Sequence, residues 1–252
     1  MMVPCSAPAA ASVPEPLTRF EGIARSAGNG RILYRELHFV RRVDARVVAR
    51  TVFYTCDDGR PFARKDLQYV EPLIPDLDIT DARAGTRTTV TRADGGHVIT
   101  TTGPGGKPPR VHRFNSEPGL VADAGFNELL LHQWDALVSG QEISFRIALL
   151  GSGSIHSLKA RRVERTAVAG EEREHFQVAL GGLLGLIAPA IDVWYASNGH
   201  ALRRYQGVSN LRDEQGREMN VTIDFPPATV RTTTDAEWQT TSALPLTRSC
   251  GT

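Results

Sequence analysis

Short runs rich in Val, Tyr, Phe and Thr succeed one another from Arg31 onward, and turn-forming residues separate them. Residues 31–43 and 45–56 are two such runs with only Asp44 between them, which predicts a tight hairpin. Asp58-Gly59 and Asp94-Gly95 are dipeptides that favour further tight turns. Successive strands joined by such turns pair antiparallel, so we expect a mostly β fold built from hairpins.

The same pattern continues through both halves of the chain. Further strands are expected at residues 61–70, 86–92, 97–102, 141–150, 155–167, 173–180, 191–195, 201–210 and 217–225. Pro72 and Pro75 are expected to break regular structure around residues 72–85, and residues 103–109 form a flexible loop rich in Gly and Pro. The chain therefore consists of two β blocks on either side of a central segment.

That central segment, residues 122–140, has the spacing of a helix. Its apolar residues recur every three to four positions and form one stripe, which consists of Phe126, Leu130, Trp134, Leu137 and Val138. We expect Asp123 to cap the start of one long helix and Gly140 to end it in the left-handed conformation. The opposite face carries Glu128, His132 and Asp135, and without metal-ligand spacing these residues indicate a solvated face.

The charge balance argues against nucleic acid as a partner. The chain has 29 Lys and Arg against 28 Asp and Glu, a formal net charge of +1. Such a chain has no net field that attracts a polyanion or an anionic membrane. We therefore expect no nucleic-acid partner.

The three cysteines, Cys5, Cys56 and Cys250, lie far apart and have no metal-ligand spacing. Isolated thiols are the favoured interpretation. A disulfide between Cys56 and Cys250 is the alternative, and it requires export of the protein to an oxidising compartment.

Residues 1–16 contain small residues in an A-x-A arrangement, Ala7, Ala9 and Ala11, which resembles a signal-peptide cleavage region. Pro4 and Pro8 interrupt what should be a continuous apolar helix. Two interpretations remain open, the end of a longer export signal or an Ala/Pro leader without regular structure. We therefore exclude this segment from the fold and expect a periplasmic or otherwise exported protein.

The most apolar stretch runs from Val178 to Tyr195. Its uninterrupted part, residues 178–191, is shorter than the roughly 20 residues that cross a bilayer. The glycines at 181, 182 and 185 lack the register of a dinucleotide-binding loop. We thus predict no transmembrane segment, and the stretch is either ordinary core or the lip of a pocket.

Motifs for catalysis are missing from the sequence. Residues 103–109 resemble a phosphate-binding loop, but Pro108 stands where its Ser or Thr belongs. Ser152 and Ser154 do not form a G-x-S-x-G motif, and the seven histidines form no pair at ligand spacing. We therefore expect no cofactor and no metal, and we nominate no catalytic residue.

Two groups of motifs carry a family resemblance. The strand with Arg203, Tyr205, Gly207, Ser209 and Asn210, followed by Asp213 and Gly216, resembles the C-terminal hairpin of uncharacterised exported proteobacterial proteins of a domain-of-unknown-function class. In the first block, YRELH (residues 34–38) and FYTCDDGRPFARKDLQY (residues 53–69) resemble the beginning of the same proteins. The likeness extends from about Arg31 to Phe225, and its motifs are strand and turn signatures.

The resemblance implies a half-barrel similar to that of periplasmic lipoprotein carriers, wrapped around a helix. The expected fold class is mostly β (α+β), with an antiparallel, strongly curved sheet or half-barrel and one main helix on its concave face. We divide the chain into the leader at 1–16, a single β-rich domain at 17–227 and an irregular C-terminal tail at 228–252.

The leading functional hypothesis is a non-catalytic exported protein that binds or carries an apolar, lipid-like ligand or supports the cell envelope. The candidate ligand contacts, each of which also fits an ordinary core position, are Trp134, Leu183, Leu184, Leu186 and Trp194. One alternative is an interaction module that binds another envelope protein through a sheet edge or apolar patch. Another is an enzyme with a site assembled across the sheet from residues such as His38, Asp81 and Arg83.

Overall fold

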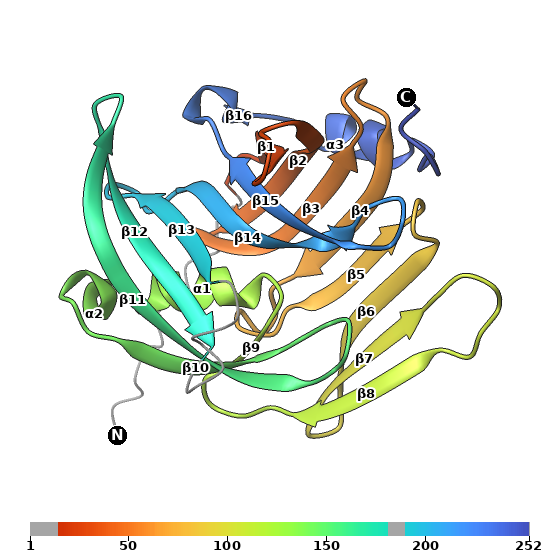
Figure 1. Ribbon diagram of the computed structural model, residues 1–252, viewed down its shortest axis with the longest axis horizontal. Helices are drawn as coiled ribbons and strands as arrows, with labels where there is room; N and C mark the ends of the chain where they lie inside the picture. The colour runs from red at the N-terminus through yellow and green to blue at the C-terminus, as the bar shows by residue number, and fades with distance from the viewer. Residues whose placement is uncertain (1–14, 181–189, 252) are drawn as a thin grey trace, which may run out of the picture.

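A single curled sheet runs through the residues that the computed structural model describes, 15–180 and 190–251 (Figure 1). Its first half, in pairing order, consists of β8 (Arg110–Asn115), β7 (Gly96–Thr102), β6 (Thr86–Ala93), β5 (Asp76–Asp81), β4 (Pro61–Gln68), β3 (Arg46–Thr55), β2 (Ile32–Val43) and β1 (Thr18–Ser26). The order continues with β15 (Glu218–Asp224), β14 (Leu202–Arg212), β13 (Ile191–Ala196), β12 (Glu171–Leu180), β11 (Ile155–Val168), β10 (Ile143–Ala148) and β9 (Leu120–Ala122). Neighbours pair antiparallel except β9 and β10, which are parallel. The predicted mostly β, half-barrel fold is confirmed.

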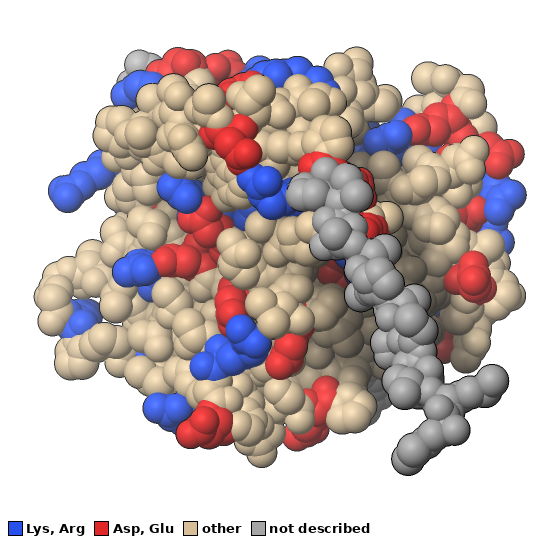
Figure 2. All heavy atoms as spheres, turned by 180° about the vertical axis from the view of Figure 1, so that it is seen from behind, with Lys and Arg blue, Asp and Glu red and all other residues tan. Residues whose placement is uncertain are grey.

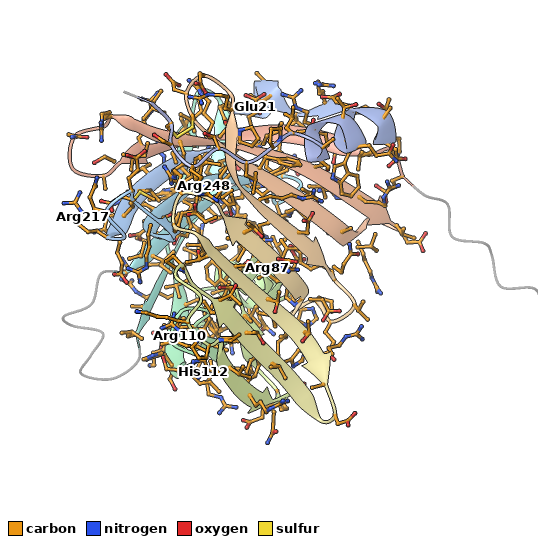
Figure 3. The ribbon with its side chains drawn as sticks, turned by 90° about the vertical axis from the view of Figure 1, so that its right-hand side faces the viewer. Glu21, Arg87, Arg110, His112, Arg217 and Arg248 are labelled. Atoms are coloured by element: carbon orange, nitrogen blue, oxygen red, sulfur yellow. A yellow bond between two sulfur atoms is a disulfide. The ribbon has the colours of Figure 1, made fainter. Side chains whose placement is uncertain are left out.

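The sheet does not close, because its edge strands β8 and β9 do not pair with each other in the described residues. Arg110 and His112 lie on the edge strand β8 (Figure 3). His112 lies against the loop between β10 and β11, where a Cβ on Gly153 would come within 2.1 Å of the imidazole. The two ends of the sheet therefore approach each other through side chains, without a strand ladder.

The hairpin predicted at Asp44 is confirmed. Asp44 and Ala45 both have positive φ, 50° and 63°, as a two-residue turn of the I′ type requires. The other predicted strands form within a few residues of their expected ends. Before the C-terminal segment, β1, β5, β8 and β9 are strands that were not predicted. β5 begins directly after Pro75, which shows that a proline before a strand's first residue does not prevent pairing.

The expected single helix is two helices, α1 (Gly125–His132) and α2 (Trp134–Val138), with Gln133 between them. The predicted apolar stripe is confirmed, because Leu130, Trp134 and Leu137 are buried against the sheet. Gly140 has the predicted left-handed conformation, with φ +92°. The predicted cap was wrong: Asp123 makes no capping hydrogen bond, since its carboxylate binds Lys65 and Asn210 instead.

The core lies on both faces of the sheet. On the concave side, α1 and α2 pack on the strands of the second half through a cluster that includes Leu130, Trp134, Leu137, Phe145, Phe176 and Tyr195. On the convex side, α3 (Asp235–Ser242) covers β1 to β4, and Trp238 stacks on Phe39 with 6.2 Å between ring centres. Figure 1 shows α1 inside the hollow of the sheet and α3 outside it.

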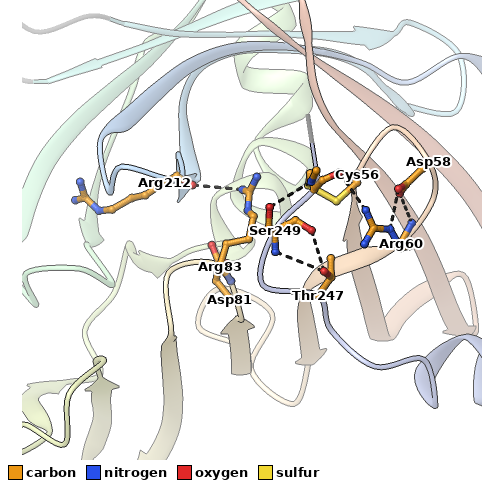
Figure 4. The surroundings of a disulfide bond; sticks show 10 residues. Cys56, Asp58, Arg60, Asp81, Arg83, Arg212, Thr247 and Ser249 are labelled. Carbon is orange, nitrogen blue, oxygen red and sulfur yellow. Dashed lines mark hydrogen bonds and ion pairs between the residues drawn. A yellow bond between two sulfur atoms is a disulfide. The ribbon is translucent and has the colours of Figure 1, made fainter.

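The C-terminal segment is not irregular, so that prediction was wrong. It contains a 3₁₀ turn (Pro227–Thr229), β16 (Arg231–Thr232), which pairs with β1, and α3. A disulfide joins Cys250 to Cys56 at the end of β3, with the two Cα atoms 5.3 Å apart (Figure 4). Isolated thiols were the wrong interpretation for this pair. The segment is ordered by tertiary contacts, which its own weakly patterned sequence does not reveal.

Candidate functional site

The concave face of the half-barrel holds a cavity of about 210 Å³. It lies between the start of α1 and the strands β2, β3, β4, β13, β14 and β15. One part of its wall is apolar and includes Val52, Leu67, Phe126, Ile147, Leu158, Ile191, Val193 and Leu202. The other part is polar and includes Tyr34, Glu36, His38, Arg50, Lys65, Asp123, Asn127, Ser209 and Asn210. The cavity thus has the mixed lining of a small-molecule site.

Strand alternation places the polar residues on one wall. Side chains two positions apart on a strand point to the same face, so Tyr34, Glu36 and His38 of β2 all face the cavity. The same rule brings Arg50 of β3 and Lys65 of β4 to this face.

The carboxylate of Asp123 is almost fully buried in this wall. Lys65 Nζ lies 2.9 Å from its Oδ2, and Asn210 Nδ2 donates to its Oδ1 at 2.7 Å. The side chains of Lys65 and Asp123 are 8% and 1% exposed, so this ion pair is almost fully removed from water. Asp123 itself has a φ of 43°. One carboxylate therefore links β4, the entry to α1 and β14 across the cavity.

His38 and Glu36 form a second buried pair. His38 Nε2 lies 2.9 Å from Glu36 Oε2, and the imidazole stacks on Phe20 with 4.4 Å between ring centres. Burial lowers the pKa of His38 below its ordinary value, and the hydrogen bond to Glu36 opposes that effect. The imidazole is therefore neutral near pH 7, with its proton on Nε2 because the carboxylate can only accept. Nδ1 is shielded from solvent and has no hydrogen-bond partner among the described residues.

The neutral His38 predicts a pH dependence of stability. The unfolded state binds a proton with the ordinary histidine pKa of about 6.5, while the folded state resists it. The neutral imidazole of His38 stabilises the fold fully above about pH 6.5. This stabilisation is lost as the pH falls from about 6.5 toward the lower pKa that His38 has in the folded state. We expect the free energy of unfolding to fall by up to about 1 kcal/mol per pH unit just below pH 6.5. Urea unfolding of the wild type and of His38→Gln at several pH values measures this, and an equal slope in both would contradict it.

Four tyrosines line the cavity, and the hydroxyls of three of them have hydrogen-bond partners. Tyr34 Oη and Ser209 Oγ are 2.8 Å apart, Tyr205 Oη donates to the Val208 carbonyl at 2.7 Å, and Tyr195 Oη donates to Asn127 Oδ1 at 3.0 Å. Burial is the main cause that raises the pKa of each of these phenols. They are therefore protonated hydroxyls that orient neighbouring groups, and they do not act as bases.

Arg50 differs from the other ionisable residues of the wall. Its guanidinium makes no hydrogen bond and no ion pair with any residue in the described ranges, and its Nε is shielded from solvent. The other cation, Lys65, already has a carboxylate partner. Arg50 is therefore a cation of the wall whose donors no described residue engages.

The two tryptophans named as candidate contacts do not line the cavity. Trp134 packs edge-on against Phe176 at 5.2 Å and stacks on His200 at 3.9 Å, between α2 and the sheet. Trp194 stacks on His175 and lies between two cavity-facing residues of β13, so it faces the convex side. The other three candidates, Leu183, Leu184 and Leu186, lie outside the described residues. From the same apolar stretch, Ile191, Val193 and Tyr195 do line the cavity.

The residues suggested for an enzyme are not brought together. Asp81 accepts from the backbone N–H groups of Arg83 and Ala84, and Arg83 lies over the ring of Phe62, 3.4 Å from its centre. Only His38 of that set lines the cavity. In the described part of the chain, no group of three or more His, Cys, Asp or Glu is arranged to hold a metal ion.

Apart from His38, the polar residues that do meet were not among the candidates from the sequence. Tyr34, Glu36, His38 and Lys65 lie in the first block of motifs that carry the family resemblance, and Tyr205, Ser209 and Asn210 lie in the second. These motifs were interpreted as strand and turn signatures. The signal that identifies them is polar residues at alternate positions of strands that are otherwise rich in apolar residues.

A wider groove of about 1080 Å³ lies beside the disulfide. Among its charged residues, Asp58 pairs with Arg60 at 2.7 Å and Asp213 pairs with Arg217 at 2.7 Å (Figure 4 shows the first pair). Figure 2 shows acidic and basic residues interspersed on one whole face of the molecule. The groove is thus an open, charged surface, and the concave cavity is the better candidate site.

The described helices are all too short or too polar to span a bilayer. No family model matches the sequence, and no curated protein matches it either. Among solved structures, the chain is similar to a β-barrel-like protein of the domain of unknown function DUF1849 from Brucella abortus, with 10% identity, a TM-score of 0.45 and coverage of 87% of this chain and 98% of that one. It is also similar to a DUF1329 family protein from Desulfovibrio piger, with 11% identity, a TM-score of 0.29 and coverage of 91% and 92%.

Proposed function

We propose that this chain is a non-catalytic exported protein that binds an apolar, lipid-like ligand in the concave cavity. The observation that carries the proposal is the composition of the cavity wall. Apolar side chains from β3, β4, α1, β10, β11, β13 and β14 line much of it. Burial of a ligand's apolar surface against such a wall stabilises the complex by roughly 25 cal/mol per Å².

The polar part of the wall supports binding over catalysis. Lys65 is held by Asp123, and Glu36 is held by His38. The buried phenols Tyr34, Tyr195 and Tyr205 are protonated and hydrogen-bonded. A general base must be deprotonated at the working pH, and burial keeps these phenols protonated.

Export is supported by the disulfide and by residues 1–16. Disulfides persist in oxidising compartments and are rare in the cytosol. The bond between Cys56 and Cys250 joins residues 194 positions apart, and it secures a segment that packs on the outside of the sheet. Together with the small-residue pattern at Ala7, Ala9 and Ala11, this favours a periplasmic or extracellular location.

The first test is mass spectrometry of organic extracts from protein purified without detergent after export to a bacterial periplasm. A lipid at near one-to-one stoichiometry is the expected result. Protein that carries no ligand and binds no added apolar probe would contradict the proposal.

A variant that fills the cavity should lose binding. Ile191→Trp adds an indole at the cavity wall, and we expect at least a roughly 10-fold weaker affinity for the fluorescent apolar probe N-phenyl-1-naphthylamine. Ile155→Trp is the matched control, because Ile155 is 40% exposed and does not line the cavity. Probe titration measures both variants, and equal affinities in the two would contradict a site in this cavity.

A further inference from the structure

The wall of the cavity carries as many formal positive as negative charges, but one of its cations lies outside the Lys65–Asp123 ion pair. Its Lys, Arg, Asp and Glu residues are Arg50, Lys65, Glu36 and Asp123, whose formal charges sum to zero, and His38 is neutral. Lys65 and Asp123 compensate each other at 2.9 Å, and Glu36 accepts a hydrogen bond from His38. Arg50 forms no ion pair with any residue in the described ranges.

The surroundings of Arg50 add a second group without a partner. Arg50 is paired with Leu67 in the β3–β4 ladder, so Tyr69, two residues further on, is its diagonal neighbour on the same face. The hydroxyl of Tyr69 is also shielded from solvent and has no hydrogen-bond partner in residues 15–180 and 190–251. Buried donors are normally satisfied in native proteins. Arg50 lines the cavity and Tyr69 does not, so the guanidinium is the group that an acceptor bound in the cavity would contact.

The planar guanidinium selects the kind of acceptor. Its five N–H groups form a rigid fork that matches the two oxygens of a carboxylate or a phosphate. Because the guanidinium of Arg50 forms no ion pair with a described residue, one anionic group can pair with it directly.

The size of the cavity limits the apolar part of the ligand. Its volume of about 210 Å³ lies below the ~300–1,000 Å³ typical of pockets for drug-sized ligands and above the ~150 Å³ of a cavity that binds benzene. A two-chain phospholipid does not fit within such a volume. A single aliphatic chain of medium length does, along Val52, Leu67, Leu158 and Val193.

We infer that the ligand is a single-chain amphiphile with one anionic head group, of the fatty-acid type, and that Arg50 binds its head group. This inference rests on the proposed function, because it concerns the same cavity. Arg50 then determines which amphiphiles bind, while the apolar wall supplies most of the affinity.

The test compares four ten-carbon ligands on the full chain at pH 8 by displacement of N-phenyl-1-naphthylamine. They are decanoate, decyl phosphate, decanol and decyltrimethylammonium. We expect decanoate to bind about 10- to 100-fold more tightly than decanol, the effect of one charge-assisted hydrogen-bonded contact. Decyltrimethylammonium should bind most weakly. Decyl phosphate distinguishes a phosphate head group from a carboxylate: stronger binding than decanoate would overturn the fatty-acid assignment.

The Arg50→Gln variant should lose this preference and bind decanoate no better than decanol. Arg113→Gln is the matched control, because Arg113 lies on the edge strand β8, is exposed, and makes no ion pair with described residues. Circular dichroism confirms that each variant is folded. If Arg50→Gln does not fold, the ligand series on the wild type still decides the question.

The outcomes separate this inference from the proposed function. Equal affinity for decanoate and decanol on the wild type, or unchanged selectivity in Arg50→Gln, would overturn the role of Arg50 and leave the apolar site intact. Failure of the probe and all four ligands to bind the wild type would overturn the proposed function itself.

Discussion

Replacing Cys56 and Cys250 together with serine is expected to lower the free energy of unfolding by about 4–5 kcal/mol. The disulfide closes a loop across a sequence separation of 194, and long closed loops restrict the unfolded chain most strongly. Cys56 is 2% exposed and belongs to the concave core, so the variant also places a hydroxyl in an apolar environment. Urea unfolding under non-reducing conditions measures the loss.

Reductant provides the control for the disulfide. Wild-type protein in dithiothreitol should unfold at nearly the same urea concentration as the double variant, and the variant should not respond to dithiothreitol. We expect α3 to detach from the sheet before the sheet itself unfolds, which separates Trp238 from Phe39. Hydrogen exchange should therefore report faster opening at residues 235–242 than in the sheet. A loss below about 1 kcal/mol would contradict a structural role for the bond.

Replacing Asp123 with alanine is expected to cost about 3–5 kcal/mol. The substitution leaves Lys65 charged, 8% exposed and without its partner, and it removes the acceptor of the Asn210 amide. Breaking a buried ion pair from one side is costly because the remaining charge is not compensated in the low-dielectric interior. Urea unfolding at pH 7 measures the difference from the wild type.

A double-mutant cycle isolates this cost. The variant Lys65→Met with Asp123→Ala removes both charges, and we expect it to be more stable than Asp123→Ala alone. Glu142→Ala serves as the matched control, because its pair with Lys159 is exposed, with side chains 51% and 44% accessible for Lys159 and Glu142. That control should change the free energy of unfolding by no more than about 0.5 kcal/mol. A double variant less stable than Asp123→Ala would show that the charge on Lys65 is not the source of the effect.

The cavity residues show how far the sequence leads toward the site. On β2, the alternation of Tyr34, Glu36 and His38 with their neighbours already places the three on one face. The same alternation does not predict whether that face packs against α1 or is exposed to solvent. The contact of Lys65 with Asp123 spans 58 positions, and that of Asp123 with Asn210 spans 87. No local pattern encodes pairings of this length, so Asp123 was assigned a capping role that it does not have.

The apolar stretch 178–195 illustrates the same limit. Its strand at Ile191–Ala196 was predicted from residue type, and three of its side chains line the cavity. Trp194, the largest apolar side chain there, faces away because β-strand geometry alternates its neighbours. Size and hydrophobicity alone therefore do not predict which side chains of this strand line the cavity.

By itself, the sequence determined the local structure: the hairpins at Asp44 and Asp94-Gly95, the apolar stripe of α1 and α2, and the mostly β character of the chain. These features depend on backbone preferences and side-chain periodicity over a few residues. Only the tertiary structure decided the pairing of β1 with β15, the Cys56–Cys250 disulfide, the attachment of α3 and the convergence of Arg50, Lys65 and Asp123 on one cavity. Such contacts form because the whole sheet curls to bury its apolar faces, and the free energy of that burial is a sum over the entire chain.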